Sequence, residues 1–254
     1  MDLTLVDVTR ITRDAYADAF RRVTGRPLVL LPQMAGQSES EIFFEALARN
    51  DAAPTVPATA AVTDDGSDEL LARFVTELAT AFGARRELLT TRGRIQPGAM
   101  ESVLAVAELP GVVQSVLTGT IRPNAAAKLR AFGLERFFDM EIGGYGSEIY
   151  PKGAQLLESR HRAAAKYGPA GSEPAAVYIG DSTRDVEAAL VSGAGSVAVA
   201  TGRSTEADLR AAGADVVLPD LTDTAAVIRA IQRCGPPPAS PPPASRLPVG
   251  RSPG

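Results

Sequence analysis

Cysteine is almost absent from this chain: among its 254 residues, Cys234 is the only one. A single thiol excludes a disulfide within the chain and any zinc site built from several cysteines. An excess of positive charge is also lacking, because 26 Lys and Arg residues stand against 30 Asp and Glu residues, a formal net charge of −4. A broad nucleic-acid-binding surface needs a basic excess, so we expect no nucleic-acid partner.

Long apolar runs are missing as well. No stretch approaches the ~20 apolar residues that a membrane-spanning helix requires. The N-terminus carries Asp2 and Asp7 where a secretory signal would carry Lys or Arg followed by an apolar segment. These absences predict a cytoplasmic protein with no membrane partner, and the sequence favours no particular oligomeric state.

The apolar content of 45% is enough to build a sizeable core. Short apolar runs at residues 175–180, 196–200 and 214–218 alternate with amphipathic helical patterns around Val186–Leu190 and Leu209–Ala212. Such alternation is typical of βαβ units and of a parallel sheet that is covered on both faces. The runs at residues 113–119 and 137–144 extend the series upstream. The sequence therefore predicts an α/β fold.

Helical spacing dominates a different part of the chain, residues 12–92. Its aromatic residues Tyr16, Phe20, Phe43 and Phe44 are expected in a helical core, and residues 51–67 are expected to form a loop. We predict a helical insertion at 12–92 in an α/β core formed by residues 1–11 and 93–234. Residues 235–254 contain 8 of the 19 prolines and are expected to form a disordered tail.

Two carboxylates follow the predicted strand at 175–180. Asp181 comes directly after that strand, and Asp185 lies four residues later, at the start of the next helix. Open parallel sheets bind ligands at this edge, and an oxygen-rich pair of carboxylates suits Mg²⁺. The alternative interpretation is that both aspartates simply cap the helix.

Further polar residues also lie where a predicted strand ends or a predicted helix begins. Thr118 and Gly119 follow the run at 113–119 and could hold a phosphate with a hydroxyl and a backbone N–H near a helix start. The alternative is an ordinary turn. Lys152 precedes another predicted helix, where a lysine is usually solvated, but directed into the carboxylate pocket it would offset negative charge and hold a phosphate.

The N-terminal residues Asp2–Asp7 resemble the end of the D-x-D-x-T-L-V-D signature of the haloacid dehalogenase (HAD) superfamily. Thr118, Lys152 and Asp181 with Asp185 are similar to its second, third and fourth motifs, in the same order. The insertion matches the family's C1 cap in size and place, as in phosphoglycolate phosphatase-like enzymes. The resemblance implies a HAD-type Rossmann-like parallel-sheet core with an inserted helical cap domain.

The resemblance also implies a function: a Mg²⁺-dependent phosphatase of a small phosphorylated metabolite, acting through an aspartyl-phosphate. Asp2 would be the general acid and base, and its main-chain carbonyl would bind Mg²⁺ together with Asp181, supported by Asp185. Thr4, Thr118, Gly119 and Lys152 would serve the substrate. A phosphomutase that uses the same intermediate, or a ligand-binding protein without catalysis, are the alternatives.

One motif position departs from the family pattern. The nucleophilic aspartate of the signature stands two residues before the second aspartate, so alignment at Asp2 places it one position before Met1. The apolar strand that normally precedes it is also outside the sequence. We therefore expect the natural product to begin upstream, and the sequence that starts at Met1 to be inactive. Asp7 lies out of register for the nucleophile.

Overall fold

The computed structural model describes residues 1–51, 67–147, 152–168 and 175–235. The predicted loop at 51–67 and the predicted tail at 235–254 lie outside these ranges, apart from their end residues.

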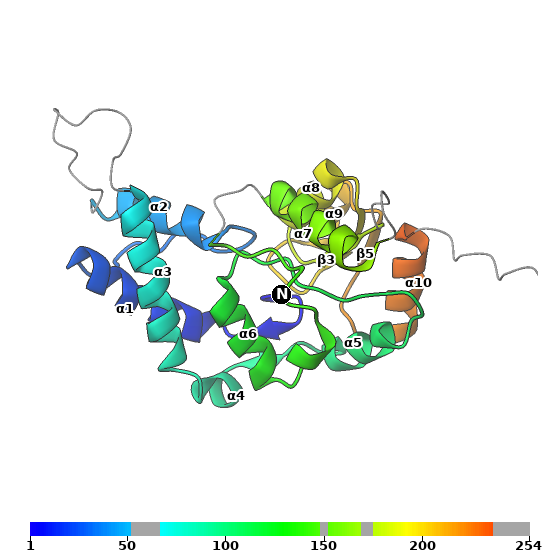
Figure 1. Cartoon of the computed structure of the whole chain (residues 1–254), viewed down its shortest axis with the longest axis horizontal. Helices are drawn as coiled ribbons and strands as arrows, with labels where there is room; N and C mark the ends of the chain where they lie inside the picture. Colours follow the sequence, from blue (N-terminus) through cyan, green and yellow to red (C-terminus); the bar gives the residue numbers. More distant parts are fainter. Residues whose placement is uncertain (52–66, 148–151, 169–174, 236–254) are drawn as a thin grey trace, which may run out of the picture.

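A parallel three-stranded sheet occupies one half of the molecule (Figure 1). Its order is β3 (Val177–Gly180), β4 (Gly195–Val199) and β5 (Val216–Leu218). The intervening and following helices are α8 (Thr183–Ser192), α9 (Glu206–Ala211) and α10 (Thr224–Cys234). The predicted alternation of strands and helices is confirmed.

Successive side chains of β3 reach opposite faces of this sheet. Tyr178 packs with α7 (Lys152–Tyr167) and α8, whereas Ile179 packs with α5 (Ala99–Ala107) and α10. Because both faces are covered, the strands are mostly apolar rather than alternating in polarity.

The upstream segments at 113–119 and 137–144 do not form continuous strands, contrary to the sequence prediction. They meet in one parallel bridge, Leu117–Gly144, in which the Gly144 N–H donates to Val116 O at 3.0 Å. Among the described residues no strand pairs with the second edge of β3, and the Tyr178 hydroxyl donates to Leu117 O (3.3 Å) across the gap. Because it has a partner on one side only, the segment at Leu117 makes only this short pairing.

The N-terminal residues lie in the middle of the molecule, beside this gap (Figure 1). The Leu5 N–H donates to Met1 O at 2.8 Å, and Leu3 adopts a left-handed φ of 61°, so residues 1–5 form a tight turn. The chain then enters β1 (Val6–Asp7), which pairs antiparallel with β2 (Arg94–Ile95). This turn presents Asp2 and Thr4 at the end of β3.

Four helices occupy the other half: α1 (Thr9–Thr24), α2 (Glu39–Arg49), α3 (Ser67–Gly83) and α4 (Leu88–Arg92). Tyr16, Phe20 and Phe43 are fully buried as predicted, while Phe44 is half-buried, and the rings of Phe43 and Phe74 stack at 4.1 Å. Helix α1 begins three residues before the predicted boundary at residue 12. The division into core and cap domains stays a prediction.

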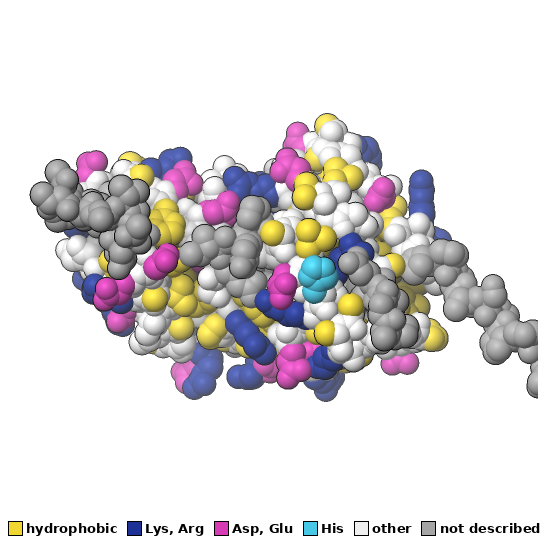
Figure 2. Space-filling model, turned by 45° about the horizontal axis from the view of Figure 1, so that its top comes forward, with side chains coloured by type: hydrophobic (Ala, Val, Ile, Leu, Met, Phe, Trp, Pro, Cys, Tyr) yellow, Lys and Arg dark blue, Asp and Glu magenta, His cyan; other side chains and the backbone are white. Residues whose placement is uncertain are grey.

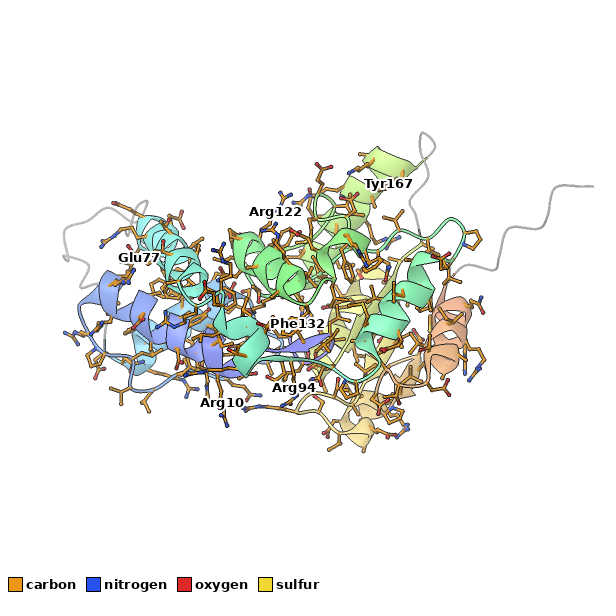
Figure 3. The ribbon with its side chains drawn as sticks, turned by 90° about the horizontal axis from the view of Figure 1, so that it is seen from below. Arg10, Glu77, Arg94, Arg122, Phe132 and Tyr167 are labelled. Carbon is orange, nitrogen blue, oxygen red and sulfur yellow. The ribbon has the colours of Figure 1, made fainter. Side chains whose placement is uncertain are left out.

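Helix α6 (Arg122–Ala131) joins the two halves, and η1 (Glu135–Phe137) follows it. Phe132, at the end of α6, packs against both the helical core and the cluster around Val6, and it lies near the centre of the molecule in Figure 3. The helical half and the α/β half therefore share apolar contacts through α6.

The surface carries the chain's one histidine, His161, which Figure 2 shows at the exterior. Its side chain is 63% exposed beside Glu158, so a metal-ligating role has no structural support. Among the described residues, none of the helices combines the length and apolar character needed to cross a bilayer.

Candidate active site

A cavity of about 300 Å³ lies where β3 and the Leu117 segment end, between the two halves of the molecule. Its volume suits a small ligand. Six of the seven predicted site residues line it: Asp2, Thr118, Gly119, Lys152, Asp181 and Asp185. The seventh, Thr4, is buried beside the wall and contacts the site through Asp181. Residues far apart in sequence are thus brought together as the motifs predict.

Asp181 follows the last residue of β3. The Thr4 hydroxyl donates to its Oδ1 at 2.6 Å, and no described residue donates a hydrogen bond to its Oδ2. Burial, and after it the negative charge of Asp185, raise the pKa of Asp181 to about 6. A cation placed at Oδ2 would offset both effects, which makes Asp181 suited to bind one.

Asp185 is held by hydrogen bonds on both oxygens. Its Oδ1 accepts from the Tyr178 hydroxyl (2.8 Å) and the Lys152 ammonium, and its Oδ2 accepts from Asp181 N, Ser182 N and Ser182 Oγ. Burial opposes ionisation, but the Lys152 charge and these bonds hold the pKa of Asp185 well below its usual range. Asp185 is therefore both a member of the capping box of α8 and a wall of the cavity, so the two sequence interpretations are compatible.

Lys152 is the first residue of α7 rather than a residue before it. Its side chain is only 17% exposed, pairs with Asp185 and lies 5.7 Å from the centre of the Tyr178 ring. Because it also lines the cavity, it can contact an anionic ligand while remaining paired. The solvated alternative is wrong for this lysine.

The Thr118–Gly119 turn reaches the cavity, but the start of α6 is already occupied. The Thr118 hydroxyl accepts from Thr120 N at 3.1 Å, and the Ile121 N–H donates to the carboxyl group of Glu39 on α2. A phosphate can therefore use the Thr118 hydroxyl and the Gly119 N–H, whereas the Ile121 N–H is unavailable to it.

Two buried residues of this site escaped the sequence analysis: Lys128 on α6 and Glu39. Lys128 is 1% exposed, and its ammonium lies 2.8 and 3.0 Å from the two oxygens of Asp2. This charge, with hydrogen bonds from Lys128 and Thr120, lowers the pKa of Asp2 although burial opposes it. Lys128 lies in helical register with the buried Ala125 and Leu129, a spacing that would have predicted its burial.

Glu39 is the first residue of α2 and is 3% exposed. Burial raises its pKa to about 8, against the opposing charge of Lys128 and the Ile121 hydrogen bond. Its backbone N–H donates to Gly119 O at 2.9 Å. The start of α2 thus attaches the helical half to the loop that carries the predicted phosphate ligands.

The side chains around the cavity offer few free oxygen ligands for a metal ion. Among the described residues no three Asp, Glu, His or Cys side chains converge in a way that could hold a metal ion. Asp185 and Asp2 already accept several hydrogen bonds, so Asp181 is the carboxylate with an available oxygen. A hard cation that keeps most of its water ligands fits this arrangement.

Gly119 permits the close contact between this loop and the helical half. A Cβ atom at Gly119 would lie 1.9 Å from Gln37 O. Gly119→Ala is expected to displace the loop before α2 and to destabilise the fold by about 1–3 kcal/mol, measured as a lower Tm. Gly83→Ala is the control, because a Cβ at Gly83 meets nothing within 4 Å. Equal Tm values for the two variants would contradict the close contact.

The chain matches a family model described as haloacid dehalogenase-like hydrolase over residues 1–190 and a second, HAD-hydrolase-like model over residues 158–224. Among curated proteins no significant match is found.

Solved structures share the fold at low sequence identity. A predicted phosphoglycolate phosphatase from Haemophilus somnus is 19% identical, with a TM-score of 0.56 and coverage of 90% of this chain and 95% of that chain. A β-phosphoglucomutase candidate from Bacteroides vulgatus is 16% identical (TM-score 0.58; coverage 92% and 87%). CbbY from Rhodobacter sphaeroides, in complex with xylulose-1,5-bisphosphate, is 19% identical (TM-score 0.56; coverage 88% and 92%).

The family model covers most of the sequence and includes every predicted site residue. The expected parallel-sheet fold is confirmed by the strand order, and the solved structures match it over most of their length. The chain belongs to the haloacid dehalogenase-like hydrolase family.

Proposed function

We propose that this protein is a Mg²⁺-dependent phosphatase of a small phosphorylated metabolite. The observation that carries the proposal is Asp181, a buried carboxylate with one available oxygen, facing a cavity that also contains the ammonium group of Lys152. A carboxylate beside an ammonium group suits a substrate anion that is bound together with a cation. The phosphatase name of the Haemophilus structure agrees with this chemistry.

Each residue has a proposed role in phosphate binding. The Thr118 hydroxyl, the Gly119 N–H and the Lys152 ammonium hold the non-bridging oxygens of the substrate, and Thr4 fixes the orientation of Asp181. Helices α1 and α2 and residues 31–37, all part of the proposed cap, border the cavity, where they would exclude water.

Mg²⁺ would be held by Asp181 and the main-chain carbonyl of Asp2, with Asp185 acting through water. When bound, it would shield the phosphate charge from the attacking carboxylate. Asp185 keeps Lys152 and the Asp181 backbone in place through its own hydrogen bonds.

Asp2 is the proposed acid and base. Its carboxylate pairs with Lys128, and the charge of Lys128 lowers the pKa of Asp2 although burial opposes it. The ionised form is the one that accepts a proton from the hydrolytic water. Once protonated, Asp2 can protonate a leaving alkoxide. An aspartate added immediately before Met1, at the end of an added apolar strand, would supply the nucleophile of the family signature.

Asp7 is not a candidate nucleophile. Its carboxylate pairs with Arg94 at 2.6 Å, accepts from Thr9 and lies outside the cavity lining.

The test compares the 254-residue chain with an extended chain, in which an apolar strand ending in aspartate is added before Met1, using p-nitrophenyl phosphate with Mg²⁺ or with EDTA. We expect hydrolysis only by the extended chain and only with the metal. A well-folded extended chain that is inert toward a broad panel of phosphoesters would contradict the phosphatase function.

A phosphomutase is the second candidate, favoured by the fold shared with the Bacteroides structure. The two functions differ in product, because a phosphatase releases inorganic phosphate and a mutase returns it to a sugar. Stoichiometric release of phosphate from a hexose monophosphate would decide for the phosphatase.

A further inference from the structure

Lys128 is the most deeply buried cation that the described residues contain, and it lies outside the motifs that define the family resemblance. Its ammonium group contacts both oxygens of Asp2 and, at 3.1 Å, the hydroxyl of Thr120. The Thr120 hydroxyl in turn donates to Asp2 Oδ2 at 3.0 Å. Lys128, Thr120 and Asp2 therefore form a closed hydrogen-bonded triangle.

The triangle is enclosed at Lys128 and open to the cavity at Asp2. Lys128 is 1% exposed, whereas the Asp2 side chain is 36% exposed and lines the cavity. Lys128 also lines the cavity, but its ammonium group makes its three hydrogen bonds to Asp2 and Thr120. With bonds to both oxygens, rotation of the carboxylate about its Cβ–Cγ bond is restricted.

Fold stability does not explain such a lysine. Replacing a buried ion pair by apolar residues of similar volume is often neutral or stabilising, whereas removing one partner alone is strongly destabilising. On a helix that is buried at Ala125 and Leu129, an apolar residue at position 128 would pack at lower cost. The ammonium group is therefore expected to serve Asp2.

We propose that Lys128, assisted by Thr120, is a positioning residue that fixes the orientation of the Asp2 carboxylate at the cavity wall. The inference rests on the proposed function, in which Asp2 takes a proton from the attacking water. Lys128 lines the same cavity, but its ammonium group is engaged by three hydrogen bonds to Asp2 and Thr120, so it acts through Asp2.

The helical half contributes to the surroundings of Lys128. The Phe82 ring of α3 has its centre 5.4 Å from the ammonium nitrogen, and the carboxyl group of Glu39 on α2 interacts with the same charge. The cation–π contact stabilises the ammonium group at this depth. The helical insertion thus supports Asp2 indirectly, through Lys128.

The first test is a thermodynamic cycle on the 254-residue chain with Lys128→Met, Asp2→Asn and the double variant. Lys128→Met alone is expected to lower Tm by roughly 5–10 °C, because a partly buried carboxylate loses its partner. The double variant is expected to recover a large part of that loss. Arg130→Met is the control on the same helix, since Arg130 pairs at the surface with Glu135, and its Tm should change little. Additive Tm losses would overturn the pairing.

The second test measures kcat and KM in the extended chain. Lys128→Met should lower kcat by about 10–100-fold with KM unchanged, and should have no further effect on kcat in the Asp2→Asn background. Equal losses in both backgrounds would show a purely structural role and overturn the proposal. If Lys128→Met does not fold, Thr120→Val removes one of the bonds to Asp2 and should lower kcat several-fold, while an unchanged kcat would contradict it.

The two tests separate the inference from the function on which it rests. If the extended wild-type chain has no phosphatase activity, the proposed function fails, and the Tm cycle still decides whether Lys128 and Asp2 are coupled. If the wild-type chain is active and Lys128→Met retains full kcat, the positioning role alone is wrong.

Discussion

Asp181→Asn is expected to reduce kcat/KM of the extended chain for p-nitrophenyl phosphate by at least about a thousandfold, because a neutral amide is a poor ligand for a hard cation. The substitution keeps the side-chain shape and leaves an oxygen to accept the Thr4 hydrogen bond. It also removes a negative charge that lies close to Asp185. Activity should therefore fall while Tm stays equal or rises.

This opposite response of activity and stability is typical of a functional carboxylate rather than a structural one. Glu187→Gln is the matched control, since Glu187 is an exposed carboxylate on the same helix as Asp185. It should leave both kcat/KM and Tm close to the wild-type values. If Asp181→Asn retained substantial metal-dependent activity, Asp181 would not be a metal ligand, and the proposed mechanism would lose its main support.

Much of the fold follows from local patterns in the sequence. Local sequence patterns predict the strand at 177–180, helix α8 and the turn between them. The apolar run that ends in Gly180 correctly placed Asp181 directly after the strand. The short run at 113–119 is also a predicted strand and likewise ends in glycine, but it has a partner on one side only. Continuous strand structure there depends on pairing, which composition does not contain.

Some of the site residues can likewise be predicted from local patterns, and others cannot. Asp181, Asp185, Lys152 and Thr118 stand at the ends of recognisable elements, and the topology of a parallel sheet brings them to one edge. Lys128 is different, because the residue type indicates a surface position and only its spacing with apolar neighbours indicates burial. The direction of its charge toward Asp2 is a tertiary property that no local pattern shows.

The burial of Glu39 is another tertiary property that no local pattern shows. From it we predict how the stability of the protein changes with pH. Its sequence context, directly after the N-cap Ser38, is that of an exposed first-turn glutamate, a position favoured by the helix dipole. In the structure its carboxyl group is enclosed by the start of α6, near Lys128, Asp2 and Tyr16. Burial dominates, so its pKa is about 8 rather than 4.5.

A raised pKa in the folded state means that folding retains a proton which the unfolded chain releases. The contribution of Glu39 to stability is therefore fully present below pH 4.5 and is lost as pH rises toward about 8. The expected slope is about −1.4 kcal/mol per pH unit within that window. Above it the contribution is constant, because Glu39 is then ionised in both states.

Glu39→Gln should remove this slope, because the carboxamide does not titrate yet keeps an oxygen to accept the Ile121 N–H. The free energy of unfolding, measured by urea titration from pH 4 to 9.5, should thus rise for the variant relative to the wild type across the window. Glu45→Gln on the same helix is the control, as Glu45 pairs with Arg49 at the surface. The difference in unfolding free energy between Glu45→Gln and the wild type should not change with pH across this window.

A difference between Glu39→Gln and wild type that is independent of pH would mean that Glu39 is ionised when the protein is folded. The α6 start and Lys128 would then stabilise the Glu39 carboxylate more strongly than burial opposes it, so that the attachment of α2 to the phosphate-binding loop would be an ionic contact rather than a neutral hydrogen bond.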